Sequence, residues 1–375
     1  MYDFSGVVSV GSNLLFSPSY LHDINKSLKK AIFVRENTVN MGMEIRKPQI
    51  TNDIETKNSF DFLRFFLALM VFFAHYDILR GVSFVNSPIT SPMAVSGFFT
   101  ISGLLIFRSY CRSNSLKSYF LKRVKRIFPA YVLVVLLVVP LFACFSELPL
   151  REYFLSAELF RYLVANLATM NFLHPSLPGV LSGEAVNPSL WTIKVELFLY
   201  LLVPLVASLY AKSSRVWSVV VVVLTSLLAT WLKRTADDTG VPTYDLVGKW
   251  VSLVAYFMAG AAAYLFREEL KRYKYFLILP AMSILALETR DAEFFRPFAM
   301  GVAIYFFAFT TPFLNKFGKI GDLSYGIYIF HGPIVNLTIC LGWEDGPHTF
   351  FITLFLVLLV AFFSWHLLEK KILSR

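Results

Sequence analysis

The chain has 375 residues, of which 56% are hydrophobic and 16% charged, whereas soluble proteins average about 45–50% apolar and about 25% charged residues. This composition excludes an ordinary water-soluble domain, and the apolar residues gather into runs of roughly 17–25, long enough to cross a bilayer. The net charge of +10 does not indicate a nucleic-acid partner, because the basic residues lie mostly in the links between apolar runs, where they set membrane orientation. The sequence therefore predicts an all-α, polytopic membrane protein.

The cysteines give no sign of redox or metal chemistry. Cys111, Cys144 and Cys340 are odd in number, widely spaced and inside or beside apolar segments, which supports neither a disulfide framework nor a CxxC site. Metal-ligand spacing, a nucleophile elbow, a phosphate loop and a Rossmann glycine pattern are also absent from the sequence. We expect no metal and no bound cofactor.

The first 58 residues differ from the rest in being mixed and polar. We expect them to form a poorly ordered extension before a membrane domain at 59–371, which a short tail at 372–375 follows. Met41 and Met43 lie just upstream of the first apolar run, so we expect the natural start at one of them. No cleavable signal peptide is apparent, and the first apolar run is expected to act as the insertion signal.

The apolar runs predict about ten membrane helices, of which the seventh is short. Residues 153–173 mix apolar and charged positions, so this segment is either an eleventh span or a helix that lies on the membrane surface. The ten predicted helices lie near residues 60–79, 93–108, 129–146, 188–210, 216–232, 247–266, 275–288, 295–314, 324–341 and 349–368.

The charges of the links favour ten spans. If the N-terminus is cytoplasmic and residues 153–173 do not cross, most Lys and Arg residues of the links lie inside and most acidic links lie outside. An eleventh span would place every later link on the opposite side of the membrane. We therefore predict a protein of the cytoplasmic (inner) membrane with both termini in the cytoplasm.

Three ionisable residues, Asp61, Arg64 and His75, interrupt the first apolar run. Arg64 and His75 are eleven residues apart, close to three helical turns, so they share a face and lie about 16 Å apart along the axis. Asp61 joins that face three residues before Arg64. Ionisable groups are costly in hydrocarbon, so we expect an interior site; alternatively Asp61 and Arg64 anchor the interface and His75 bonds a neighbouring helix.

Two later segments carry weaker signals. Residues 96–103 include two serines and two glycines, which permit close approach of a second helix. Residues 122–126 contain four cations, which either hold phosphates of a ligand or lipid headgroups, or only set the topology.

Two more ionisable residues lie within apolar helices. Glu196 is roughly two turns into the fourth helix, where it is either a structural partner of Lys194 or His75, or a catalytic group. His331 lies mid-helix beside a Gly-Pro break. Such breaks often line functional cavities in membrane proteins, but a packing kink explains this histidine equally well.

Six segments, taken together and in order from about residue 59 to 371, resemble the acyltransferase-3 family of integral membrane acyltransferases. Each motif alone is weak. Lys122 and Lys125 stand where arginine is usual, and Leu197 replaces a frequent second glutamate. The matching segments are Asp61 to Arg64 with His75; residues 98–106; Arg123 with residues 126–129; residues 190–196 with Tyr200 and Pro204; residues 325–328 with His331; and Ser364 to Glu369.

The resemblance implies transfer of an acyl group, usually acetyl from acetyl-CoA, to a hydroxyl of a cell-surface or exported glycan or a lipid-linked glycan. It implies catalytic roles for His75, Arg64 and Glu196. Acyl-CoA would be the donor substrate, and membrane lipids would surround the protein. The sequence carries no signal for the oligomeric state. The residues expected to bind substrate are Asp61, Arg123, Arg126, Ser102, Trp191, Tyr325 and His331.

A sugar hydroxyl is a poor nucleophile, so the implied reaction needs a base, and a neutral histidine is the usual one near pH 7. His75 is expected to serve either as this base or as a transient acyl carrier. Arg64, Arg123 and Arg126 would hold CoA phosphates at the cytosolic side. The acceptor would approach from the outer side, near Trp191 and Glu196.

Two other functions compete with this one. A secondary transporter could export a glycan or acyl unit without covalent chemistry, although transporters often carry internal repeats and the Arg64/His75 pattern has no second copy. A family scaffold that only organises glycan assembly is the third possibility. Release of free CoA by the purified protein distinguishes an acyltransferase from both.

Overall fold

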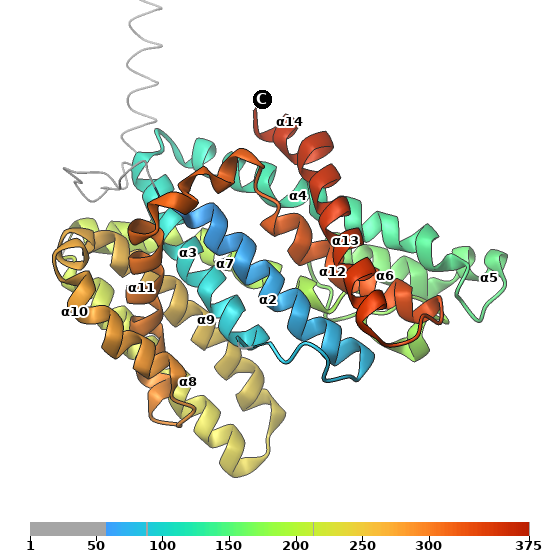
Figure 1. Cartoon of the computed structure of the whole chain (residues 1–375), viewed down its shortest axis with the longest axis horizontal. Coiled ribbons are helices and arrows are strands. Elements are labelled where there is room, and N and C mark those ends of the chain that lie inside the picture. Colours follow the sequence, from blue (N-terminus) through green and yellow to red (C-terminus); the bar gives the residue numbers. More distant parts are fainter. Residues whose placement is uncertain (1–57, 88, 213, 375) are drawn as a thin grey trace, which may run out of the picture. The chain divides into compact units, whose positions relative to one another are not determined.

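The structure is a computed structural model that describes residues 58–374 except residues 88 and 213. Every regular element in this part of the chain is a helix, which confirms the all-α prediction (Figure 1). The expected N-terminal extension and the start at Met41 or Met43 lie outside the described residues. The helices are α2 (Phe60–Arg80), α3 (Ser91–Arg112), α4 (Leu116–Ala143), α5 (Leu150–Leu155), α6 (Ala157–Leu167), η1 (Leu181–Gly183), η2 (Pro188–Leu190), α7 (Trp191–Lys212), α8 (Val216–Thr239), α9 (Pro242–Leu265), α10 (Arg267–Ala286), α11 (Ala292–Thr310), η3 (Pro312–Lys319), α12 (Ser324–Cys340), α13 (Pro347–Phe363), η4 (Ser364–Glu369) and α14 (Lys370–Leu373).

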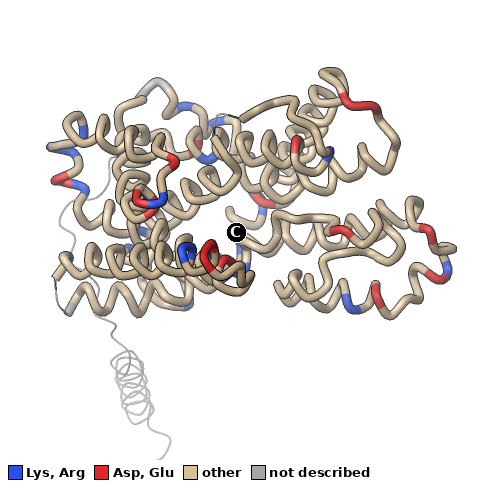
Figure 2. The backbone as a smooth tube through the Cα atoms, turned by 90° about the horizontal axis from the view of Figure 1, so that it is seen from below, with Lys and Arg blue, Asp and Glu red and all other residues tan. Residues whose placement is uncertain are grey.

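Each of the ten predicted segments lies largely in a helix, and eight helical segments of the described chain are long and apolar enough to cross a membrane. Two of the predicted membrane helices are not among these eight. They are α10, which begins with a charged stretch, and α12, which has 17 residues. The chain is a multi-pass membrane protein, and ten crossings remain a prediction. Charged positions gather at helix ends and links, whereas long stretches of the helices carry none (Figure 2).

The segment predicted either to cross or to lie on the surface forms two short helices. Helix α6 has 11 residues and is capped by Ser156, which precedes it and whose Oγ accepts from the Leu159 amide at 3.1 Å. A helix of this length measures about 16 Å, roughly half the thickness of a hydrocarbon core. The geometry supports the prediction that residues 153–173 do not cross.

Helices α2 and α12 lie side by side and run in the same direction (Figure 1). Near the start of α2, Arg64 pairs with Asp322, which precedes α12, at 3.1 Å. At the last residue of α2, Arg80 donates to Thr338 Oγ1 near the end of α12 at 2.9 Å and to the Trp343 carbonyl at 2.5 Å. Parallel neighbours need an odd number of crossings between them, and the ten-helix prediction supplies seven.

Glycines allow α3 and α9 to cross at backbone contact. A Cβ atom on Gly103 would overlap the carbonyl oxygen of Phe257, and one on Gly260 would overlap the carbonyl oxygen of Thr100. This reciprocal contact confirms that the small residues of segment 96–103 permit close helix approach.

Two prolines inside helices free carbonyl oxygens that accept hydrogen bonds from side chains elsewhere in the chain. Pro204 has no N–H to bond the Tyr200 carbonyl, and Tyr119 Oη donates to that oxygen at 3.0 Å. Pro333 likewise frees the Ile329 carbonyl, which accepts from Asn187 Nδ2 at 2.8 Å. The Gly-Pro break in α12 is therefore tied to the segment that leads into α7.

Candidate active site

A pair of histidines joins α2 to α12. His75 Nδ1 lies 2.7 Å from His331 Nε2. On the far side of the pair, His331 Nδ1 lies 3.0 Å from the Ile327 carbonyl oxygen. On the near side, His75 Nε2 lies 3.2 Å from Ser91 Oγ at the start of α3. Tertiary structure thus gives the predicted catalytic histidine a partner that sequence spacing did not reveal.

The two rings differ in accessibility. His331 has no exposed surface, and the rings of Phe72 and Tyr328 lie near it, with centroids 6.4 and 6.1 Å away. His75 is partly exposed. Of the two histidines, His75 is therefore the one that a reactant can touch.

An ion-pair network, which we define as Asp61, Arg64, Arg126, Asp322 and Glu369, occupies the other end of α2. Arg64 pairs with Asp61, as the three-residue spacing predicts, and both arginines share Asp322 Oδ2, with Arg126 Nη2 at 2.5 Å. Arg126 Nη1 also lies 3.4 Å from the buried Glu369. The guanidinium groups of α2 and α4 are thus matched with three carboxyl groups, which come from α2, η4 and the residues before α12.

Asp322 is the centre of this network. Burial alone would raise the pKa of its carboxyl group, but Arg126, Arg64 and hydrogen bonds from Ser324 outweigh that cost and lower the pKa to about 2. Asp322 was not singled out in the sequence, because a lone aspartate in a polar link carries no periodic or spacing signal. Arg64 and Arg126, which are expected to hold phosphates, would have to exchange carboxylate partners to do so.

Arg123 has different surroundings from the other two predicted phosphate ligands. Its Nη2 donates to Ser109 Oγ at 3.2 Å, and its guanidinium lies 6.0 and 5.8 Å from the ring centroids of Tyr119 and Tyr200. A serine hydroxyl and two aromatic faces leave its charge less compensated than the charges of the ion-pair network. Arg123 is the predicted cation most readily available to an anionic group.

Glu196 contacts neither of the partners that the sequence suggested. Its Oε1 accepts from Tyr200 Oη, one turn later on α7, and from Ser102 Oγ of α3 at 3.3 Å. Lys194 instead places its Nζ 3.9 Å from the Phe172 ring centroid. The structure thus brings two predicted site residues, Glu196 and Ser102, into contact.

The remaining predicted residues have separate positions. Tyr325 Oη donates to the Ile127 carbonyl at 2.8 Å, and its ring lies 5.6 Å from the Arg126 guanidinium, which places it beside the ion-pair network. Trp191 is the first residue of α7 and is partly exposed. Ser91, a contact of His75, was missed because it lies at a helix start without a charge to mark it.

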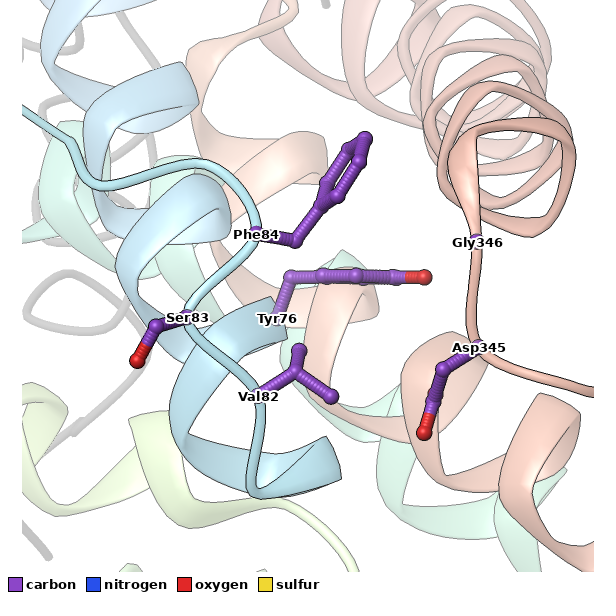
Figure 3. A pocket seen from close by; sticks show the side chains of 6 residues that line it. All are labelled: Tyr76, Val82, Ser83, Phe84, Asp345 and Gly346. Carbon is purple, nitrogen blue, oxygen red and sulfur yellow. The ribbon is translucent and has the colours of Figure 1, made fainter.

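An open pocket of about 260 Å³ lies at the end of α2 that carries Tyr76 (Figure 3). Tyr76, which follows His75 directly, contributes its ring, and Phe84 faces it from the link after α2. Asp345 and Gly346 close the opposite side from the link between α12 and α13. Within the described residues, no cluster of His, Cys, Asp and Glu has the arrangement of a metal site.

A family model described as an acyltransferase domain matches residues 57–366. The chain belongs to the acyltransferase-3 family. It is therefore a membrane acyltransferase, and the match includes His75, His331 and the arginines of the ion-pair network. No solved structure matches the chain.

Two curated proteins illustrate the relatives of this acyltransferase. It is 27% identical over 345 residues to nodulation protein 10 of Rhizobium leguminosarum bv. viciae. The aligned region covers 84% of this chain and 92% of the relative. It is 28% identical over 327 residues to an O-acetyl transferase of Shigella phage Sf6. This aligned region covers 85% of this chain and 96% of the relative. The acyltransferase thus spans nearly the full length of both relatives.

Proposed function

We propose that this acyltransferase transfers an acetyl group from acetyl-CoA to a hydroxyl of a cell-surface or exported glycan, with His75 as the general base. The observation that carries the proposal is the contact of Nε2 of the partly exposed His75 with a hydroxyl, Ser91 Oγ, at 3.2 Å. An acceptor hydroxyl in an equivalent position can give its proton to the same nitrogen. The phage relative, an O-acetyl transferase by name, supports acetyl as the group transferred.

His75 is the only proton carrier that the proposed reaction needs. As His75 Nε2 takes the hydroxyl proton, the hydroxyl oxygen bonds the thioester carbonyl carbon. The carbon–sulfur bond then breaks, and the imidazolium returns the proton to the departing thiolate, which gives free CoA and an acetyl ester. General-base assistance of this kind is typically worth about 10²–10⁴ in rate.

The donor is proposed to enter at the Arg64 end of α2, on the cytosolic side. Arg64 and His75 both face α12, as their contacts with Asp322 and His331 require, and eleven residues separate them by about 16 Å along the helix. A ligand whose phosphates lie near Arg64, Arg123 and Arg126 therefore needs a long extended arm to reach His75. The pantetheine arm of CoA is such a group.

The acceptor is proposed to approach the opposite end of α2. The pocket there presents an exposed aromatic ring, Phe84, and a carboxylate, Asp345 (Figure 3). Aromatic faces and carboxylates are suited to the apolar face and hydroxyls of a sugar.

The test is transfer of label from radiolabelled acetyl-CoA into the glycan fraction of inside-out vesicles, together with release of free CoA. We expect both with the wild type, neither with His75→Ala, and unchanged binding of CoA to that variant. The matched control is His174→Ala, since His174 is exposed in the link after α6 and should keep full activity. Full transfer by His75→Ala would refute the assignment of the base.

If His75 instead carried the acetyl group as an acyl-imidazole, CoA would be released in a burst before ester appears. Rapid mixing without acceptor distinguishes the two routes. A stoichiometric burst of CoA supports the carrier, and its absence supports the base.

A further inference from the structure

Four groups from three helices form one chain of contacts through the histidine pair. The chain runs from the Ile327 carbonyl to His331 Nδ1 at 3.0 Å, from His331 Nε2 to His75 Nδ1 at 2.7 Å, and from His75 Nε2 to Ser91 Oγ at 3.2 Å. Each of these hydrogen bonds holds one proton between its two atoms. Once the donor of the first bond is known, the donors of the other two follow.

The carbonyl at the start of the chain is the one group with a fixed role. A carbonyl oxygen only accepts, so the proton of a neutral His331 must be on Nδ1, and His331 Nε2 is then an acceptor. His75 Nδ1 must donate to that acceptor. His75 Nε2 is consequently unprotonated and accepts from the Ser91 hydroxyl.

The surroundings of His331 favour its neutral form. The ring has no exposed surface and is close to aromatic side chains, and its hydrogen-bond partners, the Ile327 carbonyl and the His75 ring, carry no negative charge. An imidazolium at this position would be a buried charge facing neutral groups, which is costly. The direction of the proton chain therefore follows from the carbonyl and not from a charge.

We infer that His331 is a positioning residue that holds His75 in the tautomer protonated on Nδ1, so that Nε2 is the proton acceptor of the reaction. This inference rests on the proposed function and names the reacting nitrogen. When His75 takes the acceptor's proton, its Nδ1–H becomes a charged donor, and its bond to His331 Nε2 strengthens. His331 therefore stabilises the transition state more than the ground state, and its loss lowers kcat without weakening donor binding.

Two amide variants separate positioning from packing. In His331→Gln the side-chain amide reaches the place of Nε2 and can accept from His75, whereas in His331→Asn it reaches only the place of Nδ1 and can contact only the Ile327 carbonyl. We expect His331→Asn to lower kcat about 100-fold with the KM for acetyl-CoA within threefold of the wild type. His331→Gln should keep at least a tenth of wild-type kcat. Equal losses in the two variants would overturn the inference.

A measurement independent of activity reports the tautomer directly. Correlation of ¹⁵N and ¹H nuclei in the histidine-labelled protein at pH 8 shows which ring nitrogen carries the proton, and the His75 signals are assigned by their absence in His75→Gln. Free histidine prefers the tautomer protonated on Nε2, so a proton on Nδ1 of His75 supports the inference and a proton on Nε2 overturns it. If the wild type transfers no label, the proposed function fails, and this measurement still decides the tautomer.

Discussion

His75 Nδ1 and His331 Nε2 are 2.7 Å apart although 256 residues separate them in the chain. The contact lies between two other polar contacts along α2, the ion pair of Arg64 with Asp322, which precedes α12, and the hydrogen bonds of Arg80. Because all three lie along two parallel helices, the arginine and the histidine of α2 are held on one face. The proposed donor site and the proposed base are thereby positioned by the same helix pair.

Arg126→Ala is predicted to affect stability as well as donor binding. The arginine compensates Asp322 at 2.5 Å and the buried Glu369 at 3.4 Å, and removing one partner of a buried pair typically costs about 3–5 kcal/mol. We expect a lower thermal unfolding midpoint in detergent and a higher KM for acetyl-CoA. The double variant Arg126→Ala/Glu369→Gln should recover part of the midpoint, because a neutral amide is less costly to bury.

Arg123→Ala is the control for this prediction, since among the described residues its guanidinium contacts a hydroxyl and not a carboxylate. We expect it to raise KM with a smaller loss of stability. A midpoint for Arg126→Ala as high as that of Arg123→Ala would show that the ion-pair network contributes little to the fold.

The bond between Tyr119 and the Tyr200 carbonyl is predicted to depend on Pro204. In Tyr119→Phe that buried carbonyl loses its donor, which typically costs about 1–3 kcal/mol. In a Pro204→Ala background the residue 204 amide can bond the same carbonyl, so Tyr119→Phe should cost less. A double-mutant cycle on unfolding in detergent measures the coupling, and additive effects would contradict the explanation.

Gly103→Ala is predicted to disrupt the crossing of α3 and α9. The added methyl group overlaps a backbone oxygen of Phe257, which cannot move without shifting the helix, and such overpacking typically costs about 1–3 kcal/mol. Gly301→Ala is the matched control, because its Cβ would lie 3.4 Å from the Ala259 carbonyl oxygen, an ordinary contact. Yield and unfolding midpoint in detergent should fall for Gly103→Ala and not for Gly301→Ala.

Asp322 is predicted to contribute pH-dependent stability. Its pKa in the folded protein is lowered to about 2, below the value of about 3.9 for an unperturbed aspartate, so the unfolded chain takes up the proton first as the pH falls. The contribution of its ionised form is complete above about pH 5 and is lost progressively from about pH 4 towards pH 2. The difference in unfolding midpoint between wild type and Asp322→Asn should therefore shrink over that range, and a constant difference would contradict the argument.

The apolar runs alone predicted the ten long helical segments, because the length of such runs is governed by the thickness of the bilayer and not by tertiary partners. The sequence also predicted that Asp61, Arg64 and His75 share a face, since helical spacing alone settles that. The ion pair of Asp61 with Arg64, the contact of Arg64 with Asp322 just before α12 and the contact of His75 with His331 in α12 agree with this prediction.

Contacts between residues of different helices could not be predicted from the spacing of residues along the chain. His331 pairs with His75, Glu196 bonds Tyr200 and Ser102 instead of Lys194, and Asp322 joins two of the predicted phosphate-binding arginines. The physical reason is that a sequence pattern reports the face of one helix, whereas the identity of the neighbour depends on how the helices pack. Packing here rests on close glycine contacts and on carbonyls freed by proline, whose partners lie far away in the chain.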